Sequence, residues 1–253
     1  MKLILFLVMF VSVTVGQTGL RKDRQLLVDF RNDHSYTPFK ITPATQRTVL
    51  SKLFRRYLAD PNQCKADFNA SNGSDPLAAA RKAGQIAPAI AAMATGSFTA
   101  PGQTQTAYVI EVSECNATHA DNFGTKRVAI FSGQQLIADV DADFMRGIAR
   151  KTDLNGDGID ELLMTSGDMA QGTVIEMATL VSFQNGRRSV LQEFGTVVED
   201  SCASGFQGSN SKASVLYVPT VAPGTMPKII QENYVATCRN TKRWKFVSTG
   251  MMQ

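Results

Sequence analysis

One short loop of this chain places oxygen-bearing side chains at the spacing that a calcium site requires. Asp153, Asn155 and Asp157 stand at positions 1, 3 and 5 of the segment D-L-N-G-D-G-I-D-E, and Glu161 stands at position 9. Ile159, at position 7, is expected to offer its backbone carbonyl to the ion while its side chain faces the core. Calcium takes six to eight oxygen ligands at flexible angles. We therefore predict that these five residues bind calcium.

The remaining residues of the loop support this prediction. Gly158 at position 6 permits the sharp backbone turn by which such a loop wraps around one ion. The acids Asp153, Asp157 and Glu161 more than balance the two charges of the ion. Asp160 is expected to point outward, away from the ion. Magnesium would fit less well, because it demands strict octahedral geometry and gives up its water reluctantly.

The residues after the loop decide which family of calcium loop it resembles. An EF-hand needs a bidentate acid at position 12, where this chain has Met164, and it needs flanking helices, whereas Leu162-Leu-Met-Thr is typical of a strand. The segment Asp153–Leu162 is similar instead to the D-x-(D/N)-x-D-G-x-x-(D/E)-L loop of FG-GAP and VCBS-type repeats. These occur in integrin α-chain propellers and in many exported bacterial proteins. Gly96-Ser-Phe98 resembles a diverged opening of a preceding blade.

The resemblance implies a loop that joins two strands of a propeller blade around a structural ion. A complete propeller needs at least four blades, with a motif in most of them. This chain has one such motif. We therefore expect a blade-like or sandwich-like antiparallel sheet rather than a complete propeller.

A second run of acids, Asp139-Val-Asp141-Ala-Asp143, also spaces its carboxylates by two. Phe144 stands where a calcium loop would have its glycine, so this loop cannot close in the same way. The alternation predicts a strand with one acidic face, or the approach to a short helix, rather than a second ion site.

The N-terminal part of the chain is predicted to be helical. Residues 17–42 are polar and mixed, and we interpret them as an arm. A helix begins at Thr42-Pro43 and stops at Asp60-Pro61. A second, alanine-rich helix opens at Asp75-Pro76 and runs toward Met93, with Pro88 as a kink or an early end. The apolar stripe of the first helix consists of Val49, Leu50, Leu53, Phe54, Tyr57 and Leu58.

Residues 96–253 are predicted to form the β domain that holds the loop, which makes the chain mainly β with a helical N-terminal portion at residues 17–95. Short runs rich in β-branched and aromatic residues alternate with Gly, Asn, Ser and Pro clusters, which is typical of a meandering antiparallel sheet. The predicted strands are 107–112, 127–131, 162–165, 174–183, 190–198, 215–218, 229–236 and 244–247.

The first residues predict export. Met1-Lys2 precedes an apolar run from Leu3 to Val15, and small residues follow it. Thirteen residues are too few to span a bilayer, which needs about 20, but they suit the core of a signal peptide at residues 1–16. No later run reaches that length. We expect a secreted or periplasmic protein without a membrane span.

Four cysteines fit an oxidising compartment, where an even number usually forms disulfides. We favour Cys202–Cys238, because both close strand-like runs of one C-terminal unit, which leaves Cys64–Cys115. The pairing of Cys115 with Cys202 remains open, because the two end similar runs.

The composition of the chain limits the classes of function that it could have. Hydrophobic residues make up 43% of the chain and the net charge is +4, which excludes a disordered chain and does not indicate a nucleic-acid partner. None of the common catalytic motifs occurs. We expect a binding or interaction role toward an extracellular or envelope protein or glycan. The alternative is a small exported hydrolase of polysaccharide or peptide with a calcium-stabilised loop, its acids drawn from Glu111, Glu114, Asp139, Asp141, Glu193 and Glu199.

Overall fold

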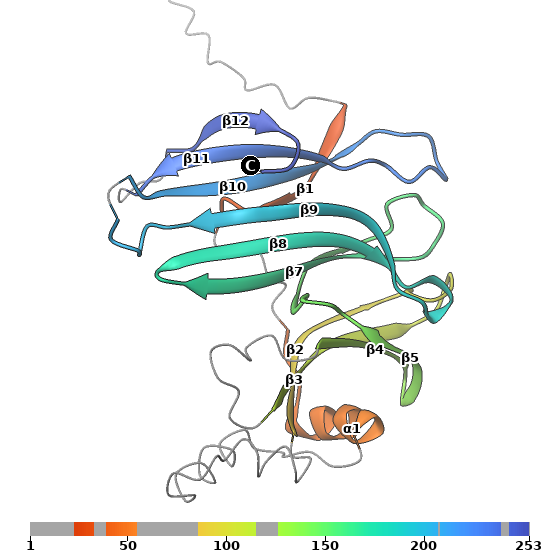
Figure 1. Cartoon of the computed structure of the whole chain (residues 1–253). Helices are drawn as coiled ribbons and strands as arrows, with labels where there is room; N and C mark the ends of the chain where they lie inside the picture. The colour runs from red at the N-terminus through yellow and green to blue at the C-terminus, as the bar shows by residue number, and fades with distance from the viewer. Residues whose placement is uncertain are drawn as a thin grey trace, which may run out of the picture.

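The computed structural model describes residues 23–32, 39–54, 86–114, 126–206, 208–238 and 243–252. Within these ranges the chain is mainly β, with antiparallel sheets and one α-helix near the N-terminus (Figure 1). The predicted fold class is therefore confirmed. No helix among these residues has the length and the hydrophobicity that a bilayer span requires.

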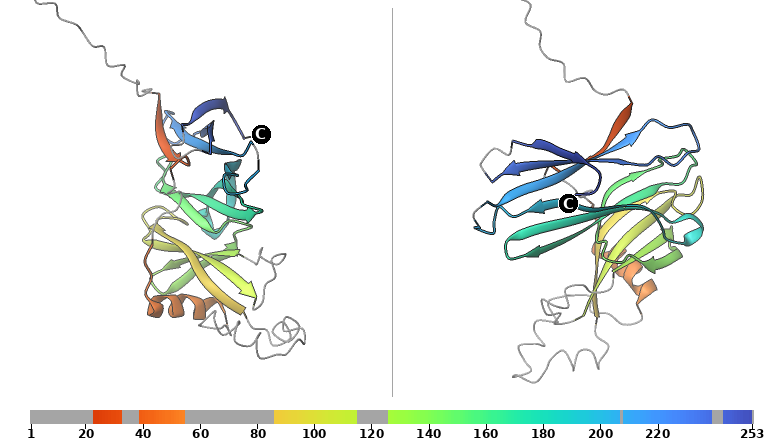
Figure 2. Two further views of the ribbon diagram at one scale, coloured as in Figure 1. Left: turned by 90° about the vertical axis from the view of Figure 1, so that its left-hand side faces the viewer. Right: turned by 45° about the horizontal axis from the view of Figure 1, so that its top comes forward.

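The smaller sheet is an antiparallel meander of four strands. Its order is β2-β3-β4-β5, so that consecutive strands are neighbours throughout. Helix α1 packs on this sheet, on the side away from the larger sheet (Figures 1 and 2). The strands are β2 (Ile86–Gly96), β3 (Gln105–Glu114), β4 (Lys126–Ser132) and β5 (Gln135–Asp141), and the helix is α1 (Pro43–Leu53).

The larger sheet has eight strands in the order β12-β11-β10-β9-β8-β7-β6, with β1 added beside β10. One edge of β10 is shared: β9 pairs with its residues 211–213, and β1 pairs with its residues 215–219. A 3-10 turn, η2 (Gln184–Gly186), separates β8 from β9. The strands are β1 (Arg24–Asp29), β6 (Gly147–Thr152), β7 (Glu161–Ala170), β8 (Thr173–Ser182), β9 (Ser189–Asp200), β10 (Asn210–Pro219), β11 (Ile230–Thr237) and β12 (Lys245–Thr249).

The main core lies between the two sheets. Successive residues of a strand point to opposite faces, and β7 shows this in Leu162-Leu163-Met164, all fully buried. Leu162 and Met164 belong to the core shared with β2–β5, whereas Leu163 belongs to a second core shared with β1, β9 and β10. Strand β7 is therefore buried on both faces, which explains its unbroken apolar run.

Helix α1 begins where the sequence predicts and ends earlier. The Thr42 side chain accepts a hydrogen bond from the Thr45 N–H at 3.1 Å, and Pro43 follows as the first helical residue. Phe54 is already extended, so the predicted end at Asp60-Pro61 is wrong. The helix buries Val49 and Leu50 against aromatic and aliphatic residues of β3 and β4. These two residues are the first members of the predicted apolar stripe.

The prediction of a second helix reaching Met93 is wrong where the structure describes the chain, because Ile86–Gly96 forms strand β2. The alanines indicated a helix by intrinsic propensity, but pairing with β3 over the whole strand prevails. Pro88 is tolerated because β2 is an edge strand, and an edge position needs no second set of backbone hydrogen bonds. Residues 75–85 of the predicted helix lie outside the described residues.

The prediction of an arm at residues 17–42 is also wrong in part, because Arg24–Asp29 forms strand β1. Apolar and polar residues alternate only weakly along this strand. It is stabilised by pairing with β10 and by the burial of Leu27 and Phe30. Each of the eight predicted β runs overlaps a strand of the structure. Strand β6 was not predicted, because Gly147–Thr152 has only one large apolar residue, Ile148.

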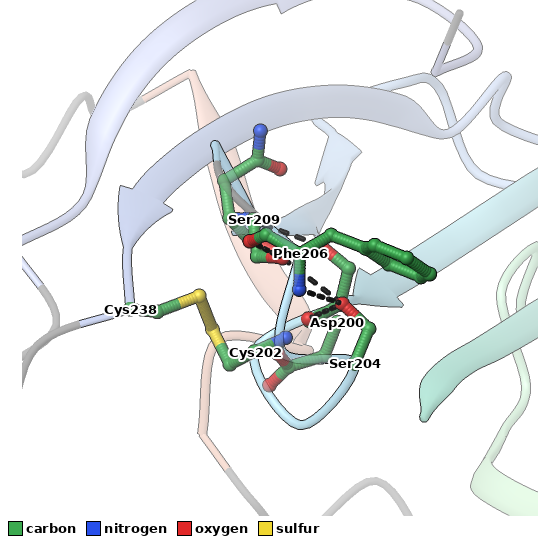
Figure 3. Close-up of a disulfide and its surroundings, with 8 residues drawn as sticks. Asp200, Cys202, Ser204, Phe206, Ser209 and Cys238 are labelled. Carbon is green, nitrogen blue, oxygen red and sulfur yellow. Dashed lines mark hydrogen bonds between the residues drawn. A yellow bond between two sulfur atoms is a disulfide. The ribbon is translucent and has the colours of Figure 1, made fainter. Parts of the chain in front are cut away.

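The favoured disulfide Cys202–Cys238 is present (Figure 3). It ties the connection between β9 and β10 to the end of β11. In that connection the Cys202 N–H donates to Asp200 Oδ1 at 2.9 Å, and the Ser209 hydroxyl donates to the Phe206 carbonyl at 2.7 Å. Cys64 and Cys115 lie outside the described residues, as do residues 1–16 of the predicted signal peptide.

Candidate calcium loop

The predicted calcium loop connects β6 to β7, two antiparallel neighbours of the larger sheet (Figure 1). Thr152 and Glu161 form the last register pair of the two strands, so the loop proper is residues 153–160. The first ligand position therefore follows β6 directly, and the last, Glu161, is the first residue of β7. The sheet fixes both ends of the loop.

Asp153 organises the backbone of the loop around its carboxylate. Its Oδ1 accepts hydrogen bonds from the N–H groups of Gly156 at 2.8 Å and Asp157 at 3.2 Å, and its Oδ2 accepts from Gly158 at 2.9 Å. Gly156 and Gly158 have φ of 75° and 83°, a region that disfavours residues with a side chain. The two glycines therefore permit the turn that curls the chain over Asp153.

Asn155 and Asp157 accept hydrogen bonds from the backbone two residues further along the loop. The Asp157 N–H donates to Asn155 Oδ1 at 3.1 Å, and the Ile159 N–H donates to Asp157 Oδ1 at 2.8 Å. The side chain of Ile159 is 2% exposed, which confirms that it faces the core. This anchor holds the second half of the loop against the sheet.

Glu161 is the buried member of the set, with 1% of its surface exposed. Its Oε2 accepts a hydrogen bond from the Leu154 N–H at 2.9 Å. Burial raises the pKa of Glu161 to about 7, and the neighbouring charges of Asp157 and Asp153 act in the same direction, while the Leu154 hydrogen bond opposes them. A negative charge at this position is therefore costly unless a cation compensates it.

No Lys or Arg among the described residues forms an ion pair with Asp153, Asp157 or Glu161. Asp160, between them in sequence, is paired: its Oδ1 lies 3.1 Å from Lys151 Nζ. The acids at the predicted ligand positions thus lack the neutralising partner that the adjacent acid has.

Asp160 is held by contacts within the fold rather than turned to solvent, since its side chain is 16% exposed. Its Oδ2 accepts the N–H of Ser97 at 2.8 Å, and its own N–H donates to the Ser97 carbonyl at 2.6 Å. A Cβ on Gly96 would overlap Asp160 Oδ2, so any side chain here would push Asp160 away from Ser97. The Gly96-Ser-Phe98 segment therefore fastens the loop to the end of β2. No pattern in the sequence indicates that the Gly96-Ser-Phe98 segment and the calcium loop are in contact.

A divalent ion would have to draw the loop carboxylates together. Among the described residues, the group of three potential ligand side chains whose atoms lie within 4.8 Å of one another is Asp200, Cys202 and Cys238, and its sulfurs are joined in the disulfide. The loop acids are spaced more widely than this. Oxygens on opposite sides of one calcium ion lie about 4.6–5.2 Å apart, so binding one ion would require the loop carboxylates to approach one another.

Three of the six acids that could serve a hydrolase form ion pairs. Asp139 on β5 forms two hydrogen bonds with Arg127 at 2.7 and 2.5 Å, which confirms an acidic strand at this run. Glu111 lies 3.2 Å from Arg146, and Glu199 lies 3.2 Å from Lys212. The Arg127–Asp139 and Lys212–Glu199 pairs join neighbouring strands, whereas the Arg146–Glu111 pair joins β3 to the residue before β6.

Comparison with known proteins gave no match for this chain, whether among protein-family models, curated proteins or solved structures.

Proposed function

We propose that this chain is an exported calcium-binding β protein with a binding or interaction role, in which a structural ion is held by Asp153, Asn155, Asp157, the Ile159 carbonyl and Glu161. The loop would act as the calcium loop of FG-GAP and VCBS-type repeats does, to which it is similar. Its ion would join β6, β7 and the end of β2 into one rigid unit, because Asp160 connects the loop to Ser97.

The observation that carries the proposal is the uncompensated charge at Glu161. A carboxylate that is 1% exposed stands beside two further acids, and no described cation pairs with any of them. Turn-forming propensity explains Asn, Asp and Gly in such a loop, but it does not explain a buried acid at position 9. A bound Ca²⁺ would satisfy the charge with oxygen ligands that one short loop supplies.

Two further features support export and an interaction role. The Cys202–Cys238 disulfide fits the oxidising compartment to which the predicted signal peptide would lead. Large apolar side chains are exposed at the far edge of the larger sheet, among them Phe246 at 56%, Val247 at 60% and Met251 at 65%. Val247 and Met251 also line a groove of about 420 Å³ with Lys212 and Tyr234. Such grouped exposure is typical of contact surfaces, and the partner would be an extracellular or envelope protein or glycan.

Thermal unfolding of the oxidised protein in millimolar calcium and in chelator tests the proposal. At about 100 times the dissociation constant, a ligand that binds only the folded state adds about 2.7 kcal/mol. For a chain of this length that corresponds to a rise in Tm of roughly 5–10 °C. Extracellular sites of this kind bind with dissociation constants of about 10⁻⁴–10⁻³ M, which sets the concentration range.

Two variants make the test specific. Glu161→Ala should abolish the calcium-dependent rise. Asp160→Ala should lower Tm in both conditions, because it breaks the contacts to Ser97 and Lys151, yet keep the rise. If neither calcium nor chelator moves Tm of the native protein, the loop is an ordinary turn and the proposal fails.

A further inference from the structure

Two cysteines and one acid form a cluster at one end of the larger sheet (Figure 3). A carboxylate oxygen of Asp200 and the sulfurs of Cys202 and Cys238 all lie within 4.8 Å of one another. Asp200 is the last residue of β9, and Cys238 directly follows β11. In the oxidised chain the sulfurs are joined in the disulfide. Once that bond is reduced, all three side chains are of the types that bind zinc.

Both cysteines are positioned by backbone contacts that involve no sulfur. Beside Cys202, the Ser201 N–H donates to the Asn210 carbonyl at 3.0 Å, and the Asn210 N–H donates to Ser201 Oγ at 3.1 Å. Beside Cys238, Thr237 forms a register pair with the same residue, Asn210. The first residue of β10 therefore holds the two cysteines next to each other, with their Cα atoms 5.2 Å apart.

The carboxylate and the solvent access of the cluster also suit a metal site. Asp200 Oδ1 accepts the Cys202 N–H at 2.9 Å, which fixes the carboxylate beside the sulfurs. Ligand atoms of one tetrahedral zinc ion lie about 3.5–3.8 Å apart, so the cluster reaches this spacing by small side-chain rotations once the sulfurs separate. Cys238 is exposed, and Asp200 and Cys202 are half-buried. A reductant can therefore reach the bond, and water can reach a bound ion.

We propose that the Cys202–Cys238 disulfide is a redox-controlled zinc site, in which the reduced chain binds one Zn²⁺ through Asp200, Cys202 and Cys238. A dithiol reductant would attack one sulfur, form a mixed disulfide and leave as its own disulfide, so that both cysteines become thiols. Zinc would then replace the two thiol protons, with a water molecule as its fourth ligand. Thiolates favour zinc over calcium, and none of the three residues is a proposed calcium ligand.

The bound ion would take over the structural role of the covalent bond. It would keep the connection between β9 and β10 attached to the end of β11 after the sulfurs separate. In an oxidising compartment the disulfide persists, so the zinc form belongs to reducing conditions.

The test is titration of the full chain with Co²⁺, a spectroscopic substitute for zinc, in the oxidised form and after reduction with a phosphine. Thiolates bound to cobalt give a charge-transfer absorption in the near ultraviolet, which carboxylates do not give. Because the reduced chain also carries the thiols of Cys64 and Cys115, the variant Cys202→Ser with Cys238→Ser is titrated under the same conditions. We expect the reduced native chain to bind one more cobalt ion, with this absorption, than the oxidised chain or the reduced double variant, and we expect zinc to displace it.

A second pair of variants tests the carboxylate. Asp200→Asn keeps an oxygen that can accept the Cys202 N–H but loses the charge, and it should weaken zinc binding to the reduced chain by at least about tenfold. Asp168→Asn, at an exposed acid of β7 near the same end of the sheet, should leave zinc binding unchanged. The inference is overturned if the oxidised chain or the reduced double variant binds as many cobalt ions with thiolate absorption as the reduced native chain, or if the two asparagine variants bind zinc equally well.

Discussion

Replacing Glu161 by glutamine should stabilise this protein in chelator, and calcium should remove that advantage. In chelator the substitution removes a negative charge that is 1% exposed and lies beside Asp153 and Asp157. Glutamine retains an oxygen that can accept the Leu154 N–H, so the turn keeps its hydrogen bond. In calcium the same substitution removes a charged ligand.

The magnitude follows from the pKa of Glu161, about 7 in the folded protein against an ordinary value of 4.5. The folded state keeps the proton in a pH range where the unfolded chain has lost it, so ionisation of Glu161 lowers stability as pH rises from about 4.5 to 7. The difference corresponds to about 3 kcal/mol above pH 7. Glutamine avoids this cost at every pH, less whatever its amide N–H₂ loses by burial.

The assay is urea unfolding of both proteins, in chelator at pH 5 and pH 8 and in saturating calcium at pH 8. At pH 5 in chelator the two should be close in stability. At pH 8 in chelator the Gln variant should be the more stable by up to about 3 kcal/mol. In calcium this difference should nearly close, because the native protein gains about 2.7 kcal/mol at 100 times its dissociation constant, and it should reverse at about 1,000 times, where the gain is about 4.1 kcal/mol.

Comparing the two proteins at each pH cancels the contributions of all other titrating groups. A Gln variant that is less stable than the native protein at pH 8 in chelator would refute the assignment of a strained, ionised Glu161. An unchanged difference between the two free energies of unfolding on adding calcium would refute its role as a ligand while leaving the burial argument intact.

Three further outcomes are expected. Gly96→Ala should destabilise the protein by about 2 kcal/mol in urea unfolding, because the new methyl group would overlap Asp160 Oδ2 and approach Lys151 Cδ to 2.9 Å; Thr95→Ala, at the exposed neighbouring position, is the control, and equal effects would contradict the close contact. Replacing Cys202 and Cys238 together by alanine should cost about 4 kcal/mol, since the bond closes a loop with a sequence separation of 36; an unchanged Tm would show that it constrains nothing. Leu163→Ala should cost about 2–5 kcal/mol, whereas Leu26→Ala, at a side chain that is 52% exposed, should change the free energy of unfolding by less than about 0.5 kcal/mol.

The sequence by itself determined the features that depend on neighbouring residues. The spacing from Asp153 to Glu161, the glycines with positive φ and the inward side chain of Ile159 follow from the local turn. The start of α1 at Thr42-Pro43 and the β runs from residue 107 onward follow from capping and from alternation. These signals act within a few residues, and for that reason they can be recognised without the fold.

Tertiary structure decided what depends on contacts between distant segments. Ile86–Gly96 has the composition of a helix and is a strand, because β3 offers it a full set of backbone partners. Arg24–Asp29 has little pattern of its own and becomes ordered along a free stretch of β10. Asp160 looked like a surface acid, yet it is separated from its partner Ser97 by 63 positions in sequence. In each case the free energy comes from long-range pairing and burial, which local propensity does not encode.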